Sequence, residues 1–116
     1  MIRCASVSTY MGPYISNYVL SELALLRKYR QQGDELIHIF PDDVAHKPWA
    51  ELFQREGAKV YYIPYAPMTP RSIATLRRIF SDEHINFIHC HFGGWDLDAR
   101  LAAPLTPMIW HQRMYV

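Results

Sequence analysis

The sequence predicts an α/β domain in which a parallel sheet of about five strands has helices on both of its faces. Half of its 116 residues are hydrophobic, which is enough for a packed core. The length suits one small domain over 1–116 and is too short for two domains. Short apolar runs alternate with longer segments of helical periodicity. Strands joined by helical crossovers pair in parallel, so the expected architecture is Rossmann-like.

The first strand is expected over 2–7 and is followed by a loop that contains Gly12. A long helix is expected over about 14–32. Its apolar residues recur every three or four positions, at Ile15, Val19, Leu23 and Leu26. Gly33 ends this helix, because glycine adopts positive φ without steric cost.

The remaining elements follow in order: a strand over 36–40, a short helix over 48–56, a strand over 60–63, a helix that begins at Thr69-Pro70, a strand over 86–91, a helix over 96–101 and a strand over 107–111. Thr69 is a good N-cap, and Pro70 suits the first helical position. In the short helix, Trp49, Leu52 and Phe53 are expected to face inward. We expect Trp110, inside a strand, to belong to the core.

A candidate site follows from the expected strand order 3-2-1-4-5. Open parallel sheets bind ligands beyond the carboxyl ends of their strands, where the strand order reverses. The loops after strands one, four and five meet there. They contain the residues that we predict to bind substrate, namely Tyr10, Gly12, His91, Gly93, Gly94 and Arg113, together with His111. Trp95, in the same region, is a further candidate for stacking on a sugar ring.

Three histidines lie on the fourth and fifth strands. His89 and His91 alternate along one strand and therefore share a face. We expect His89 to be buried and His91 to face the crevice at the strand end, with His111 beside it. Three histidines can hold zinc, but no cysteine or carboxylate in these loops completes a familiar spacing, so no metal is expected. Asp96 and Asp98 are explained by helix capping and solvation.

Composition excludes several classes of protein. A net charge of +1 gives no electrostatic case for a nucleic-acid partner. Cys4 and Cys90 fall within apolar runs, which indicates buried thiols and a cytoplasmic location. No signal peptide and no apolar run long enough to span a membrane is evident. The G-x-G-x-x-G and G-x-x-x-x-G-K-[ST] patterns are absent, which argues against a nucleotide site and a bound cofactor in this chain.

Two segments resemble family 4 glycosyltransferases. The run Asn86-Phe87-Ile88-His89-Cys90-His91-Phe92-Gly93-Gly94 is similar to the D-[IV]-[IV]-H-x-H segment of that family, with asparagine in place of aspartate. The run Pro107-Met108-Ile109-Trp110-His111 resembles the next strand of the family, which ends in a histidine near the reaction centre. Gly33-Asp34-Glu35-Leu36 partly matches the family's G-H-[ED]-V.

The resemblance implies the acceptor-side, N-terminal domain of a GT-B enzyme involved in polysaccharide biosynthesis. Such enzymes are retaining and metal-independent, and their C-terminal domain binds the nucleotide sugar. Nothing in this chain corresponds to that second domain, so the chain is expected to be incomplete at its C-terminus and inactive alone. By the resemblance, His111 lies beside the transferred sugar as a catalytic residue, Gly12 lies near the donor phosphate, and His91 lines the acceptor cleft.

Two other functions stay open. One is a flavodoxin-like, non-catalytic binding module, although a phosphorylatable receiver is excluded because Ser8-Thr9 and Pro64-Tyr65 stand where it needs acidic residues. The other is a metal-dependent hydrolase that uses His89, His91 and His111.

The expected partners are a sugar or lipid-linked acceptor. Basic residues on two helices indicate a peripheral contact with the inner face of the membrane; they are Arg27, Lys28, Arg30, Arg71, Arg77 and Arg78. An unpaired fifth strand would leave apolar surface exposed, which predicts self-association.

Overall fold

Five parallel strands form one sheet in the predicted order, β3-β2-β1-β4-β5. A computed structural model describes residues 1–13 and 15–111. The strands are β1 (Arg3–Ser8), β2 (Glu35–Pro41), β3 (Lys59–Ile63), β4 (Phe87–His91) and β5 (Met108–His111). All four strand pairings are parallel, which confirms the predicted crossover topology.

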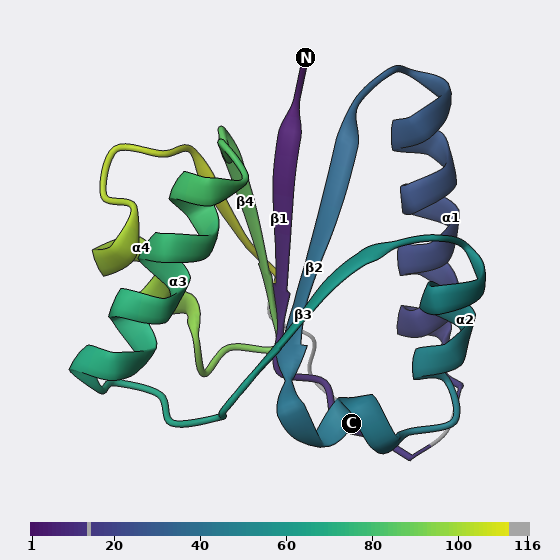
Figure 1. Ribbon diagram of the computed structural model, residues 1–116, viewed down its shortest axis with the longest axis horizontal. Helices are drawn as coiled ribbons and strands as arrows, with labels where there is room; N and C mark the ends of the chain where they lie inside the picture. The colour runs from purple at the N-terminus through teal and green to yellow at the C-terminus, as the bar shows by residue number, and fades with distance from the viewer. Residues whose placement is uncertain (14, 112–116) are drawn as a thin grey trace.

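Helices cover both faces of the sheet, as predicted (Figure 1). The helices are α1 (Asn17–Gln31), α2 (Ala50–Arg55), α3 (Pro70–Asp82) and α4 (Asp96–Ala102), and a 3-10 helix, η1 (Asp42–His46), follows β2. In Figure 1, α1 and α2 lie on one side of the strands and α3 and α4 on the other. The sheet is therefore the middle of three layers.

Helix α1 begins later than predicted. Its N-cap is Ser16, whose hydroxyl accepts a hydrogen bond from the Val19 amide. Ile15 precedes the cap and is exposed, so the prediction that it faces the core was wrong. The remaining predicted stripe is buried, and Tyr18 joins it. The predicted first residue, Tyr14, lies outside the described residues.

Helix α3 begins as predicted. The Thr69 hydroxyl accepts a hydrogen bond from the Ser72 amide at 3.2 Å, and Pro70 occupies the first turn. The predicted inward face of the short helix is confirmed for Trp49, the N-cap of α2, and for Phe53, which are fully buried, while Leu52 is half-buried.

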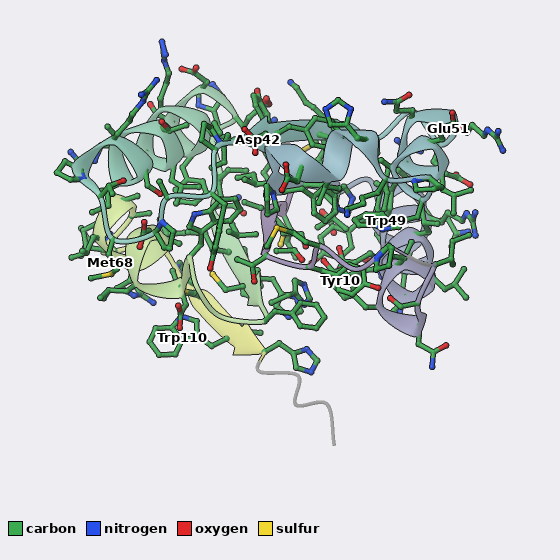
Figure 2. All side chains as sticks on the ribbon, turned by 90° about the horizontal axis from the view of Figure 1, so that it is seen from below. Tyr10, Asp42, Trp49, Glu51, Met68 and Trp110 are labelled. Atoms are coloured by element: carbon green, nitrogen blue, oxygen red, sulfur yellow. The ribbon has the colours of Figure 1, made fainter. Side chains whose placement is uncertain are left out.

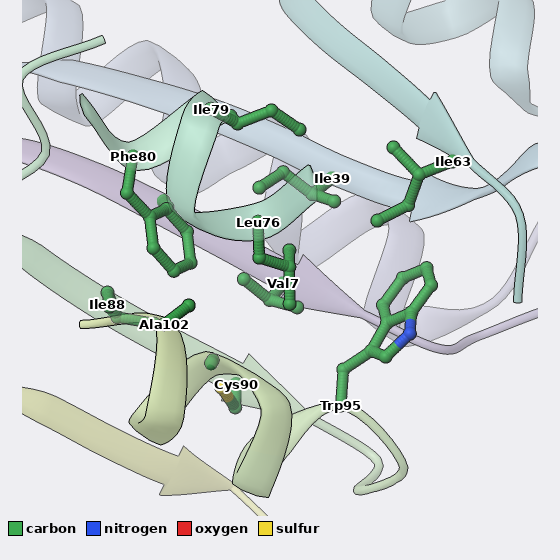
Figure 3. Close-up of a cluster of buried hydrophobic side chains, with 12 residues drawn as sticks. Val7, Ile39, Ile63, Leu76, Ile79, Phe80, Ile88, Cys90, Trp95 and Ala102 are labelled. Carbon is green, nitrogen blue, oxygen red and sulfur yellow. The ribbon is translucent and has the colours of Figure 1, made fainter. Parts of the chain in front are cut away.

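The larger hydrophobic core lies between the sheet and the α3–α4 layer (Figure 3). Leu76 of α3 packs there with Val7 and Ile88 of the sheet. Trp95 also belongs to this cluster and is only 1% exposed, so the prediction that it stacks on a sugar ring was wrong. Trp110 is 54% exposed, which contradicts its predicted core position. The reason is that Trp110 lies on β5, the edge strand of the sheet.

Asp98 is fully buried, so the predicted solvation of this carboxylate was wrong. Its oxygens accept hydrogen bonds from the Met68 amide at 2.9 and 3.0 Å. Met68 has a φ of 64°, so Asp98 holds the β3–α3 loop in a left-handed turn. Asp96 is the first residue of α4 and does not cap it, because the N-cap is Trp95. Among the described residues, none of the helices has the length and apolar character needed to traverse a bilayer.

Candidate functional site

Polar side chains gather on the sheet face that α1 covers. In the strand register, Ser6 of β1 lies beside His38 of β2 and His89 of β4. One step closer to the carboxyl ends, His91 of β4 lies beside Ser8 of β1 and His111 of β5. Residues that are partners in a parallel register share a face. A polar row therefore crosses a sheet face that is otherwise packed against a helix.

The carboxylate of Glu22, on α1, lies at the centre of this polar row and is almost fully buried. The Ser6 hydroxyl donates a hydrogen bond to Oε2 at 2.9 Å. His91 Nε2 lies 3.0 Å from Oε1, and His38 Nδ1 lies 3.4 Å from Oε2. A buried carboxylate requires such partners, because moving it out of water without any partner would cost several kcal/mol. Glu22 thus joins the helix to β1, β2 and β4.

The electrostatics of Glu22 are set by two opposing effects. Burial by itself would raise the pKa of the carboxyl group, but the close approach of His38 and His91 outweighs it and holds the pKa well below its usual range. Glu22 is therefore ionised, and its negative charge faces the histidines from the helix side.

The three histidines of β4 and β5 form a cluster. The ring centroids of His89 and His91 are 3.9 Å apart, and the ring of His111 is parallel to that of His89 at 5.7 Å. One ligand atom from each histidine lies within 4.8 Å of the others. The cluster therefore brings three imidazole nitrogens to the carboxyl end of the sheet.

The predicted exposure of His89 and His91 was reversed. His91 is only 2% exposed, while His89 is half-buried and His111 is exposed. His91 is buried because α1 covers it with Glu22 and with Tyr18, whose ring meets the imidazole edge-on at 5.1 Å. A ligand in an open cleft cannot reach His91 directly, which weakens the expectation that His91 lines the acceptor cleft.

The loops after β1, β4 and β5 converge, as predicted. The Thr9 hydroxyl donates a hydrogen bond to the Gly93 carbonyl at 2.8 Å, which joins the first two loops. The Phe92 amide donates to the His111 carbonyl at 3.1 Å, which joins the last two. Arg113 belongs to the same predicted group but lies outside the described residues.

A hollow of about 570 Å³ opens where the loops after β1 and β4 meet. It is lined by Thr9, Tyr10, Met11, Gly12, Ser16 and Phe92. Tyr10 packs against Tyr18, Trp49 and Phe92 with ring centroids 5.4 to 5.5 Å apart. The Trp49 indole donates a hydrogen bond to the Gly12 carbonyl at 2.8 Å, which fixes the loop. Figure 2 labels Tyr10 and Trp49, which lie close together. Tyr10 and Gly12 are therefore accessible to a ligand, although their predicted role stays a prediction.

Gly93 and Gly94 form the turn after β4 with φ values of 72° and 90°. At Gly94, an added Cβ would lie 2.6 Å from the Tyr65 hydroxyl and 3.1 Å from Thr9 Cγ2. Glycine is thus needed at 94 for close packing of two loops as well as for its backbone conformation. Neither glycine lines the hollow, and their predicted contact with substrate stays a prediction.

Sequence reasoning missed Glu22, although a sequence signal for it exists. Glu22 lies three residues after Val19 and four before Leu26, so it falls within the apolar stripe of the helix. A single carboxylate on a buried stripe must find a partner on the facing element. The histidines of the strands are the partners that this sequence offers.

The strand order, the two helical layers and the converging loops define a Rossmann-like domain of the type found in GT-B glycosyltransferases. No protein-family model and no curated protein matches this chain. Its fold is similar to that of MurG from Acinetobacter baumannii, a GT-B glycosyltransferase, with a TM-score of 0.71 over 97% of this chain. The sequences are 14% identical, so the similarity is one of fold, and this chain spans 35% of the length of MurG.

Proposed function

We propose that this chain is the acceptor-side domain of a family 4, retaining glycosyltransferase that acts on a glycan or a lipid-linked sugar. The observation on which the proposal depends is the convergence of the β1, β4 and β5 loops at one end of a GT-B-type sheet. In open parallel sheets this end is where ligands bind. The two sequence segments that resemble family 4 contribute the β4 loop and the end of β5.

The hollow beside Tyr10 suits a sugar. Its lining combines the aromatic rings of Tyr10 and Phe92 with the hydroxyls of Thr9 and Ser16. Small-molecule sites are typically apolar surfaces with a few polar groups that set orientation. His111 is exposed, and its carbonyl accepts a hydrogen bond from the amide of Phe92, so the end of β5 adjoins a residue that lines the hollow. A hydrogen bond from His111 to the transferred sugar would stabilise charge that develops during transfer.

The proposal assigns the nucleotide of the donor to a second GT-B domain. This chain has neither glycine-rich phosphate motif, and the hollow has no basic side chain among its lining residues. Phosphates are usually bound by backbone amides at such motifs or by cations. The nucleotide sugar is therefore a co-substrate of the enzyme that this domain does not hold by itself.

For a lipid-linked acceptor, α3 is the helix that contacts the cytoplasmic face of the membrane. Two of the exposed basic residues of α1 are engaged within the domain, since Arg27 pairs with Glu56, and Arg30 donates to the Glu56 and Gly57 carbonyls. Arg71 and Arg78 of α3 are exposed on the opposite face of the sheet. The proposal therefore places the anionic lipid headgroups against α3.

Saturation-transfer NMR on the purified chain tests this function. The probes are a panel of short oligosaccharides and short-chain lipid-linked sugars, with nucleotide sugars measured in parallel. We expect at least one glycan to bind, nucleotide sugars to bind much more weakly, and Tyr10→Ala to abolish glycan binding. Tyr29→Ala is the control, because Tyr29 is also half-buried but packs near Cys4 at the other end of β1. Glycan binding that survives in Tyr10→Ala, or no binding by any probe, would contradict the proposal.

A further inference from the structure

We propose that His89, His91 and His111 form a binding site for one divalent transition-metal ion of the zinc class. One nitrogen from each imidazole lies within 4.8 Å of the other two. In a tetrahedral zinc site with Zn–N bonds of about 2.05 Å, ligand nitrogens are about 3.4 Å apart. Binding of the ion would draw the three nitrogens together by rotation of the side chains.

The backbone holds the three histidines in place before any metal binds. His91 and His111 are register partners on the neighbouring parallel strands β4 and β5. His89 precedes His91 by two residues and so projects from the same face. Hydrogen-bonded strands fix these Cα positions more firmly than loops would, and a site on rigid elements loses little conformational entropy when it binds an ion.

Glu22 provides the second layer of a metal site. Histidines that bind metals usually direct their other ring nitrogen to a carboxylate, which fixes the ring and its tautomer. His91 Nε2 lies 3.0 Å from Glu22 Oε1, which leaves Nδ1 for a metal. That Nδ1 is buried and has no hydrogen-bond partner among the described residues. Glu22 is itself oriented by the Ser6 hydroxyl, which donates to Oε2, the oxygen other than the one beside His91.

The burial gradient leaves one coordination position for water or a ligand. His91 is buried, His89 is half-buried and His111 is exposed, so the cluster opens toward solvent on the β5 side. Three imidazole ligands with a nearby carboxylate suit zinc, nickel or copper rather than magnesium or calcium, which prefer oxygen ligands. The arrangement therefore predicts three protein ligands and an open fourth site.

This inference does not depend on sugar transfer. A metal bound here would be coordinated by a nitrogen of His111, and in the proposed function His111 forms a hydrogen bond with the sugar. Metal and sugar would therefore compete for that side chain. A chain that binds zinc but no glycan contradicts only the proposed function. A chain that binds a glycan but no zinc contradicts only the metal site.

Calorimetric titration of the metal-stripped chain with Zn²⁺ tests the site, with Co²⁺ absorption as a second measurement. We expect one ion per chain and visible bands of tetrahedral Co²⁺. His111→Ala should weaken Zn²⁺ binding at least ~10-fold, and so should His89→Gln. His111 is exposed on an edge strand, so its variant keeps the fold intact, which circular dichroism checks.

Two further variants sharpen the result. His46→Ala, which removes an exposed histidine of η1 outside the cluster, should bind Zn²⁺ with unchanged affinity. Glu22→Gln should weaken binding about 10-fold, because it removes the carboxylate behind His91. Absence of stoichiometric zinc from the unmodified chain, or undiminished affinity in His111→Ala and His89→Gln, would overturn the site.

Discussion

His91 Nε2, on β4, lies 3.0 Å from Glu22 Oε1, on α1, with both side chains buried. Glu22 also receives a hydrogen bond from Ser6 on β1. The helix that covers one face of the sheet is thus attached to it by an ionised group as well as by apolar packing. Such an arrangement is costly to break, because removing one partner leaves the others buried and unpaired.

We therefore expect Glu22→Ala to lower the free energy of unfolding by about 3 kcal/mol. Urea titration followed by circular dichroism measures the loss. Glu51→Ala is the matched control, since Glu51 is a helical glutamate that is exposed and pairs with Arg55 on the same helix. That control should change stability by less than about 0.5 kcal/mol. Equal effects of the two substitutions would show that the Glu22 contacts contribute nothing specific.

Glu83 provides a second buried carboxylate, near the amino-terminal ends of the strands and far from the candidate site. The Lys59 ammonium donates to it at 2.7 Å and the Tyr61 hydroxyl at 2.6 Å. Burial alone would raise the pKa of Glu83, but these two hydrogen bonds outweigh it, and the net pKa is lowered. The hydrogen bond to Glu83 likewise raises the pKa of Tyr61 to about 12.

The free energy of unfolding should consequently fall in acid, because Glu83 becomes protonated. In the unfolded chain Glu83 takes up a proton near its ordinary value of 4.5, whereas in the folded chain it does so at lower pH. The stability that ionised Glu83 contributes is therefore complete above its ordinary pKa of 4.5 and is lost as the pH falls through the lower pKa of the folded chain. Urea titrations between about pH 6 and pH 3 should show a shallower pH dependence for Glu83→Gln than for the unmodified chain. Parallel curves for the two proteins would contradict this.

The two glycines after β4 should respond differently to substitution. Both have positive φ, so alanine at either position costs about 1 kcal/mol in backbone strain. At Gly93 an added Cβ meets no atom within 4 Å, but at Gly94 it meets Thr9 and Tyr65. Gly94→Ala should therefore destabilise the domain more than Gly93→Ala in urea titration. The reverse order would mean that Tyr65 moves aside without cost.

The parallel strands and the two helical layers were predictable from sequence because they follow from local periodicity and from the handedness of crossovers. The strand order was assumed from the common Rossmann arrangement, and the structure confirms it. Side-chain burial at the site was not predictable from sequence. His91 lies nearer the strand end than His89, yet it is the more buried, because α1 covers it with Glu22 and Tyr18. That covering depends on how the helix crosses the sheet, which strand position alone does not specify.

The two tryptophans illustrate the same limit. Trp95 follows a glycine turn, which favours exposure, but it enters the α3–α4 core. Trp110 lies within a strand, which favours burial, but its strand is at the sheet edge. The convergence of the loops was predictable, since the carboxyl ends of parallel strands lie at the same end of the sheet. The depth of each side chain there depends on tertiary packing.

His111→Ala is the direct test of the proposed catalytic residue. In a transferase of the proposed function we expect turnover to fall about 100-fold or more, as when a hydrogen bond to developing charge is removed. The free energy of unfolding should change by less than about 0.5 kcal/mol, because His111 is exposed at the end of an edge strand. Steady-state transfer assays and urea titration measure the two effects. Unchanged turnover would remove His111 from the site.

The edge strand β5 should drive self-association of the chain. Ile109 is 50% exposed and Trp110 54% exposed, on a strand whose outer hydrogen-bonding edge faces no further strand among the described residues. Exposed apolar edges pair with other chains. Sedimentation velocity over a concentration series should show oligomers that Ile109→Lys reduces, because a charge on an edge strand opposes pairing. Leu20→Lys, at a leucine of α1 that is 55% exposed, should leave them unchanged. A monomer at every concentration, or equal effects of the two lysines, would show that β5 is not the contact.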